Sequence, residues 1–388
     1  MDYALTKEQL ALQDSFRKFC EKEIKPNAEL LDKADPGKGV EILKKNFKKL
    51  AEIGYTGLFH NEKYGGTCKD MVTQSVAQEE LAKVCASTFL SVGASVGLCG
   101  IPIAIFGTEE QKKKYIPGPI TTDLVGCFGL TEPEAGSDAI SIKTTATKKG
   151  KNWVLNGTKT FITNGSICDV AVVMAKTDPT GGKGRNVSSF IVEKGTKGFS
   201  AGKPMDKMGY RGSPTAELIF EECEVPGENL LGTENEGFIQ AMKTLEYGRI
   251  GMAMVCLGVS MACMEESIKY AKERVQFGRP ISKFQMVSFK IADMKLLTDV
   301  SRLLIYKAAW LKEIGDPGAA TAASIAKLVT SETSTQISSM AVQIHGGYGY
   351  IKEYRVERLY RDAKLGEIGE GTSEIQRVLI ARDVLAKY

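Results

Sequence analysis

The hydrophobic residues of this 388-residue chain change their spacing twice, and this double change is the strongest constraint on the fold. In the first third, apolar residues recur every three or four positions, as at Leu43, Phe47 and Leu50, which indicates amphipathic helices. Residues 122–232 show short apolar runs punctuated by glycine and proline, which is typical of strands. From Gly237 onward the helical spacing returns. Helices, then strands, then helices predict a multidomain α+β protein.

The length and this pattern together predict three domains, because one hydrophobic core rarely grows to 388 residues. We expect an N-terminal helical domain over residues 1–121, a compact β domain over residues 122–232 and a C-terminal helical domain over residues 233–388. Inside the β domain, Asn156-Gly157 stands between two short apolar runs. Because this dipeptide favours a two-residue turn between strands, we predict a hairpin there.

Local signals predict both ends of the helical parts. Thr6 and Gln9 are three residues apart before an apolar stripe, which is the capping-box pattern of a helix start. Near the C-terminus, Thr372 and Ser373 can cap a last helix over residues 374–385. Three apolar residues of that helix are expected to face a core: Ile375, Leu379 and Val384.

Glu370 lies just before that last helix, between Gly369 and Gly371. Bare backbone on both sides lets a ligand approach the carboxylate closely. An acid placed there can act as a general base, or it can simply complement the dipole of the following helix. Only two histidines occur, His60 and His345, which disfavours a multi-histidine metal site and a Ser-His-Asp hydrolase. We therefore expect a carboxylate base and no metal.

Charge, cysteines and apolar runs limit the possible binding partners and the cellular location. The net charge is +4 with acids and bases interspersed, and no Lys/Arg run suits a nucleic-acid groove. The nine cysteines are scattered without a Cys-x-x-Cys pair, and with no signal peptide we expect a cytoplasmic protein. The most apolar stretch, Thr88 to Phe106, contains three glycines and a proline. It predicts a buried helical segment, and we expect no membrane span.

Five segments carry a resemblance to a known family: Phe128–Asp138, Phe161–Asn164, Arg274–Gly278, Gln343–Gly347 and Glu370–Glu374. Together, in this order and across nearly the whole chain, they closely resemble the acyl-CoA dehydrogenase family. The resemblance implies a helical N-terminal domain, a β-barrel-like middle domain and a C-terminal four-helix bundle. It also implies one FAD per subunit and, in most members, a homotetramer.

The same resemblance implies which residues bind FAD. An ordinary strand-turn-strand or a helix-end arginine is the structural alternative for each motif taken alone. Phe161 stands where many members have Trp, and either ring offers an aromatic face. The implied FAD-binding residues are Phe128, Leu130, Thr131, Gly136, Ser137, Phe161, Thr163, Arg274, Gln276, Phe277, Gln285, Gln343, Gly346, Gly347, Thr372 and Glu374. Three of these would reach the FAD of a neighbouring subunit: Gln343, Gly346 and Gly347.

For the reaction, the resemblance implies α,β-dehydrogenation of an acyl-CoA thioester. Glu370 would take the α proton while a hydride passes from the β carbon to flavin N5, and electrons would go to an electron-transfer flavoprotein. The backbone N–H of Glu370 and a flavin hydroxyl would polarise the thioester carbonyl. Burial is expected to raise the pKa of Glu370. Some members carry the base at the position of Gly248, which leaves Glu370 as the base here and matches the short-chain branch.

Substrate contacts follow from the same resemblance, which implies Ser137, Glu246, Arg249 and Gly371. Glu246 and Arg249 are three apart on one helix face, where an ordinary salt bridge between them is the alternative. Members usually have Asp at the position of Glu246, so Arg249 is the better-supported CoA contact.

The acyl group is constrained by two features. The segment Thr88 to Ile105 is expected to line the acyl pocket and has no charged side chain, which disfavours a dicarboxylic substrate. Gly369 replaces a common Tyr and predicts a wider pocket, so a branched or cyclic acyl group stands beside butyryl. Three alternatives remain open: an enoyl-CoA reductase running in reverse, an acyl-CoA oxidase, and a flavin-free helical scaffold.

Overall fold

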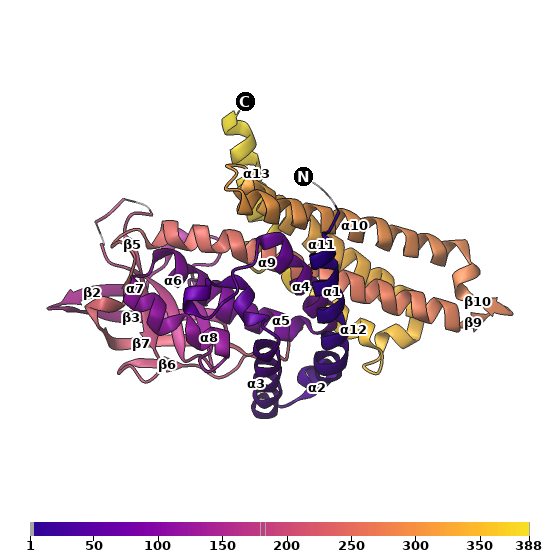
Figure 1. Cartoon of the computed structure of the whole chain (residues 1–388), viewed down its shortest axis with the longest axis horizontal. Helices are drawn as coiled ribbons and strands as arrows, with labels where there is room; N and C mark the ends of the chain where they lie inside the picture. The colour runs from indigo at the N-terminus through magenta and orange to yellow at the C-terminus, as the bar shows by residue number, and fades with distance from the viewer. Residues whose placement is uncertain (1–3, 179, 183, 388) are drawn as a thin grey trace.

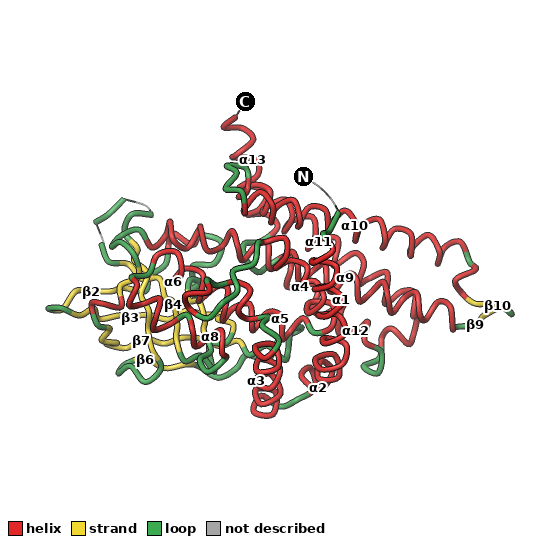
Figure 2. Tube along the Cα trace, in the orientation of Figure 1, coloured by secondary structure: helices red, strands yellow, loops and turns green. Residues whose placement is uncertain are grey.

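Helices and strands are segregated in space as they are in sequence. The computed structural model describes residues 4–178, 180–182 and 184–387. Figure 1 shows a strand-rich part at one end of the long axis and long helices at the other end, with the N-terminal helices partly between them and partly alongside the strands. Figure 2 shows the same division by secondary structure. The predicted α+β class with three parts is confirmed.

The N-terminal part consists of short helices. They are α1 (Lys7–Phe19), α2 (Lys25–Lys33), α3 (Pro36–Glu52), α4 (Met71–Val84), α5 (Ala86–Gly93), α6 (Gly100–Phe106), α7 (Glu109–Tyr115) and α8 (Pro117–Thr121). The capping box is confirmed, because the Thr6 side chain accepts from the Gln9 N–H while the Gln9 side chain accepts from the Thr6 N–H. A π-helical turn, Ala94–Cys99, joins α5 to α6 into one continuous helical stretch.

The middle part is one eight-stranded sheet. Its strands are β1 (Gly126–Gly129), β2 (Thr145–Lys149), β3 (Asn152–Thr163), β4 (Val170–Lys176), β5 (Val187–Glu193), β6 (Phe199–Ala201), β7 (Thr215–Val225) and β8 (Leu230–Leu231). The order is β6-β7-β3-β2-β4-β5-β8, with β1 paired in parallel to β4. Trp153 and Phe190 pack edge to face inside this sheet's core, with ring centroids 5.4 Å apart.

The hairpin predicted at Asn156-Gly157 is wrong. Strand β3 runs through both residues, and the pairing with β7 shifts register between Leu155 and Gly157. Gly157 has φ 144°, and a Cβ added there would lie 2.5 Å from the Thr144 side chain. The glycine therefore serves a bulge and a close backbone approach, and the turn between β2 and β3 lies at Gly150 instead, with φ 61°.

The C-terminal part is built around one long buried helix. Its elements are α9 (Gly237–Glu273), a small ribbon of β9 (Val275–Gln276) and β10 (Arg279–Pro280), α10 (Gln285–Glu313), α11 (Ala319–His345), α12 (Arg355–Ala363) and α13 (Ser373–Lys387). The segment from Met252 to Cys263 within α9 is almost wholly buried, and α9 packs against α10, α11 and α4. This helix therefore joins the bundle to the N-terminal part.

Helix α13 differs from the sequence expectation in its second half. Thr372 Oγ1 accepts from the Ile375 N–H, so the expected cap is present. Val384, however, is 45% exposed, and Figure 1 shows the end of α13 extending away from the other helices. Val384 therefore lies outside the hydrophobic clusters formed by the described residues.

Two helical stretches pass a length and hydropathy test for membrane spans, Ala86–Phe106 and Gly237–Glu273. Inside the protein, however, 56% and 78% of their most apolar windows are buried. Core helices pass the same test, so it identifies no membrane segment here.

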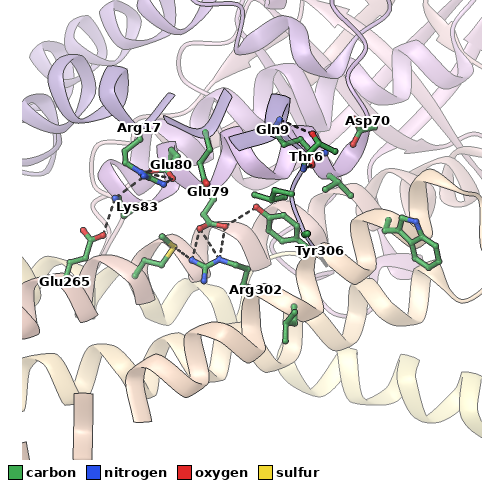
Figure 3. A pocket seen from close by; sticks show the side chains of 17 residues that line it. Thr6, Gln9, Arg17, Asp70, Glu79, Glu80, Lys83, Glu265, Arg302 and Tyr306 are labelled. Carbon is green, nitrogen blue, oxygen red and sulfur yellow. Dashed lines mark hydrogen bonds and ion pairs between the residues drawn. The ribbon is translucent and has the colours of Figure 1, made fainter. Parts of the chain in front are cut away.

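Paired charges fix the N-terminal helices to the bundle. Glu79 of α4 accepts from Arg302 of α10, with a shortest N–O distance of 2.7 Å, and from the Tyr306 hydroxyl. Glu80 pairs with Arg17 of α1 at 3.0 Å. Figure 3 shows these groups around a cavity of about 840 Å³, with both buried acids turned toward their cationic partners. Both buried acids among the described lining residues are therefore already paired with cations.

Candidate active site

Glu370 holds a buried carboxylate oxygen that has no hydrogen-bond partner. Its Oε2 is buried without a partner within the described part of the chain, although the residue as a whole is partly exposed. Desolvation raises the pKa of Glu370 to about 7, and the positive charges of Arg249 and Lys327 oppose that rise. A carboxyl group poised near neutral pH and without a structural partner can accept a proton. The expected rise in pKa is thus present.

The backbone at Glu370 is strained. Glu370 has φ 56° and Gly371 has φ 89°, so both adopt the left-handed conformation that only glycine takes readily. Such strain concentrates at functional positions and persists only where neighbouring contacts hold it. The Glu370 N–H forms no hydrogen bond with any residue that the structure describes, so it is available to a ligand's carbonyl oxygen.

Glu370 faces a cavity of about 90 Å³ between α4, α5 and α9. The expected segment does line it: Phe89, Leu90, Gly93, Ala94, Val96, Gly97, Leu98 and Ile101. Sequence reasoning missed the lining from other elements: Tyr55, Phe59, Met71, Gln74, Ser75, Gln78, Tyr247, Ile250, Gly251 and Met252. Glu370 is the one charged residue among the described lining residues. An uncharged cavity beside a lone base fits an apolar acyl group.

Three glycines near Glu370 differ in the space that a side chain would find there. A Cβ on Gly248 would lie 2.3 Å from Glu370 Oε2, so only glycine leaves room for this carboxylate position. A Cβ on Gly369 would lie 2.9 Å from Met252 Cε, which means that the methionine already occupies much of the space beside Gly369. A Cβ on Gly251, in contrast, would meet no atom within 4 Å.

Arg249 lies close to the base without being neutralised. It is buried, its Nε has no partner among the described residues, and burial lowers its pKa, an effect that Glu370 and Glu246 oppose. The salt bridge considered between Glu246 and Arg249 is not formed, because Glu246 pairs with Lys312 of α10. Arg249 is therefore a buried cation with donors free for an anionic or carbonyl ligand.

Part of the expected flavin set of the β domain lies where the strands meet α5, a helix that also lines this cavity. The Thr160 N–H donates to the Thr131 carbonyl at 2.9 Å, which places Thr131 beside Phe161. Asn164, one residue after Thr163, donates to the carbonyl of Ser91 on α5 at 2.8 Å. The remaining members of this set lie on or just after β1: Phe128, Leu130, Gly136 and Ser137.

These residues fit a flat, partly apolar cofactor. The Phe161 side chain is 69% exposed and its backbone has φ 58°, a costly arrangement for an aromatic residue unless a ligand covers the ring. Behind it, the buried ammonium of Lys159 donates to the Leu130 carbonyl and to Glu132. The strand end is thus held rigidly while its aromatic face is left open.

A second group of expected flavin residues lies at the far end of the bundle. Arg274, Gln276, Gly346 and Gly347 line a cavity of about 520 Å³, and the Arg274 guanidinium lies over the Tyr348 ring. The remaining residues of this set border the same end: Phe277, Gln285 and Gln343. Helix α9 is about 55 Å long, with β5 packed at its start and Arg274 as its C-cap. Figure 1 shows the strands that carry the first group away from the end of the long axis that bears β9 and β10, so one chain does not bring the two groups together.

The loop of the base and the last helix contain the other expected residues. Thr372 caps α13 and Glu374 is exposed in its first turn. Two contacts of this loop were not foreseen from the sequence: Lys327 of α11 and Gln376 of α13 both donate to the Gly371 carbonyl. Neither side chain belongs to a motif, so only the tertiary structure reveals them.

Comparisons with known proteins agree with this geometry. Family models match residues 6–123, 127–223 and 235–385 as the N-terminal, middle and C-terminal domains of acyl-CoA dehydrogenase. The short-chain specific acyl-CoA dehydrogenase of Clostridium acetobutylicum is 44% identical over 98% of this chain and 99% of its own. Fold and site therefore define an FAD-dependent oxidoreductase of acyl-CoA thioesters, and the chain belongs to the acyl-CoA dehydrogenase family.

Two solved structures are also similar over their full lengths. Butyryl-CoA dehydrogenase from Megasphaera elsdenii has a TM-score of 0.93 and 43% identity, covering 99% of this chain and 100% of that one. A structure described as electron transferring flavoprotein of Acidaminococcus fermentans has a TM-score of 0.94 and 46% identity, with coverage of 99% and 100%.

Proposed function

We propose that this protein dehydrogenates short-chain acyl-CoA thioesters and delivers the electrons to an electron-transfer flavoprotein. The observation that carries the proposal is the unpaired, buried carboxylate of Glu370 facing a small cavity without other charges. The names of the similar proteins support both the short chain and the electron partner.

Each chemical role belongs to a group already described. The ionised Glu370 accepts the proton from the α carbon of the acyl chain. The free N–H of Glu370 donates to the thioester carbonyl and stabilises the charge that develops there. Arg249 binds the CoA portion, and the cavity excludes water around the acyl chain. Bound FAD supplies the two-electron acceptor for the β hydrogen.

The cavity gives room beside a short acyl chain. Gly93, Gly97 and Gly251 line it, and a Cβ on any of them would meet no atom within 4 Å. Met252 fills much of the space beside Gly369, but its unbranched thioether can move aside. We therefore propose that branched or cyclic short acyl groups are accepted beside butyryl.

Anaerobic mixing with a panel of acyl-CoAs tests the substrate. The flavin absorbance should bleach fastest with butyryl-, isobutyryl- or 2-methylbutyryl-CoA and slowly with octanoyl- and palmitoyl-CoA. Best activity on long straight chains contradicts the proposal. Rapid reoxidation by oxygen after bleaching would instead support an oxidase, and faster turnover of crotonyl-CoA with reduced electron-transfer flavoprotein would support a reductase.

We propose a homotetramer in which neighbouring chains complete each FAD site. The two groups of expected flavin residues lie apart in one chain, which supports a second chain supplying the distant group. Helix α10 also exposes Met286, Phe289 and Leu296, each more than half accessible, which is unusual for a lone chain. Native mass spectrometry should give four subunits with four FAD, and a flavin-loaded monomer contradicts this assembly.

We also propose a cytoplasmic location. All nine cysteines are free thiols and eight are buried, which suits a reducing compartment. Fractionation of the source cells with an antibody against the chain tests this directly.

A further inference from the structure

Lys327 is a buried cation without an acidic partner. Its side chain on α11 is 0% exposed, and no carboxylate oxygen of the residues that the structure describes lies within 4 Å of its ammonium. Burying an unpaired ammonium is strongly unfavourable. Such a group is retained only where another contact compensates for the lost solvation.

Its one hydrogen bond goes to the loop of the base. Lys327 Nζ donates to the Gly371 carbonyl at 2.6 Å, and no further hydrogen bond of this ammonium involves the described residues. The Gln376 amide donates to the same carbonyl at 2.9 Å and to the Glu370 carbonyl at 3.1 Å. Two buried donors thus hold the left-handed pair Glu370-Gly371, the turn whose strain requires outside support.

We propose that Lys327 is a positioning residue for the base: it holds the Glu370-Gly371 turn and places a positive charge near the buried carboxylate. The proposal rests on the role of Glu370 as the base. It assigns two separable effects to two neighbours, because Lys327 brings a hydrogen bond and a charge whereas Gln376 brings hydrogen bonds alone.

The charged groups around Glu370 and Lys327 support the proposed effect of the Lys327 charge on Glu370. Glu370 feels two cations, Arg249 from α9 and Lys327 from α11, and both favour its ionised form. Burial lowers the pKa of Lys327; Cys256, Glu370 and Glu367 oppose that effect and Arg249 adds to it. Removing the ammonium leaves Arg249, of the two cations that act on Glu370 among the described residues, to favour ionised Glu370. The protonation midpoint of Glu370 should therefore move upward in its absence.

The test compares Lys327→Met, Lys327→Arg and Gln376→Met in the flavin-loaded protein. Protonation of Glu370 is followed without substrate, as the infrared difference between each protein and its Glu370→Gln counterpart across pH. Anaerobic bleaching by butyryl-CoA is measured over the same range. Lys327→Met should raise the midpoint by about one unit or more, so loss of ionised Glu370 slows bleaching about fivefold or more at pH 7. Bleaching should recover only in part at alkaline pH, because the hydrogen bond to the Gly371 carbonyl is lost at every pH. Lys327→Arg should keep the wild-type midpoint.

Gln376→Met separates charge from geometry. It should slow bleaching at every pH without moving the midpoint, because it removes hydrogen bonds from the same turn but no charge. An unchanged midpoint in Lys327→Met overturns the proposal, as does an equal shift in both Met variants. If Lys327→Met yields no folded protein, Lys327→Arg decides, and a raised midpoint there overturns it. The infrared signal needs no substrate, so the two proposals can fail separately. If none of the acyl-CoAs bleaches the flavin of the wild type, the proposed function is refuted whatever the infrared result.

Discussion

Glu370 Oε2 lies against the backbone of Gly248, so that a Cβ added to this glycine would come within 2.3 Å of the oxygen. Gly248→Ala should therefore displace the carboxylate and lower the rate of flavin bleaching by roughly 10- to 100-fold, because catalytic groups tolerate little misplacement. Gly251→Ala is the comparison on the same helix: its Cβ would enter the acyl cavity but meet no protein atom within 4 Å, so it crowds the substrate without displacing the carboxylate. Equal rates for the two variants would show that the carboxylate position is not critical.

The pH dependence of the reaction follows from the ionisation of the base. Burial raises the pKa of Glu370 to about 7, and the ionised form is the active one. The value of kcat/KM for butyryl-CoA should thus increase about tenfold between pH 6 and pH 8, because that ratio reports the free enzyme. A flat profile over this range excludes Glu370 as the titrating group.

The same shift predicts a stability cost at neutral pH. The pKa of Glu370 is raised from 4.5 to about 7 in the folded protein, so the folded state binds more protons between these values. The contribution of this group is fully present below the unfolded pKa and is lost as pH rises through the folded pKa. Glu370→Gln should therefore be more stable than the wild type by about 1–3 kcal/mol at pH 8 and equal to it near pH 4. Paired unfolding curves at both pH values measure this, and a less stable variant at pH 8 contradicts it.

The buried pair of Lys159 and Glu132 should be important for stability. Its N–O distance is 2.7 Å, and Glu132 also accepts from the Thr144 N–H. Burial lowers the pKa of Lys159 to about 8, an effect that Glu132 opposes, so the pair is charged at neutral pH. Lys159→Met leaves a buried carboxylate without its cation and should cost about 3–5 kcal/mol of unfolding free energy.

An exposed pair provides the control for that prediction. Lys143 and Glu134 form an ion pair with about 70% of each side chain exposed. Lys143→Met should change stability by less than about 1 kcal/mol. In denaturant titrations, similar losses for Lys159→Met and Lys143→Met would mean that burial adds nothing to the Lys159 pair.

Sequence patterns correctly predicted the features that depend on residues close together in the chain. The helical periodicity, the cap at Thr6 and the small residues around Glu370 are local signals, and the structure contains the corresponding helices, cap and strained loop. Asn156-Gly157 carried an equally strong local signal and gave a wrong hairpin. Its strand is paired with β7 on the side away from β2, and that tertiary pairing outweighs the turn preference of two residues.

Contacts between distant segments could not be predicted in this way. Lys327 donates to Gly371 although the two residues are 44 positions apart in the chain. The sequence around either residue does not predict this contact. Met252 fills the space that Gly369 was expected to open, because two segments far apart in sequence share that volume. The exposure of Val384 likewise depends on what packs against α13, which one helix's periodicity does not specify.

The most direct test of the account is anaerobic bleaching of bound flavin by butyryl-CoA in wild type and Glu370→Gln. Both proteins should carry the same amount of FAD, because Glu370 is not expected to hold the cofactor. The wild type should bleach within the mixing experiment, and the variant should be slower by about 10³-fold or more, in keeping with loss of the proton acceptor. Equal bleaching rates in two fully flavinated proteins would contradict the assignment of Glu370 as the base.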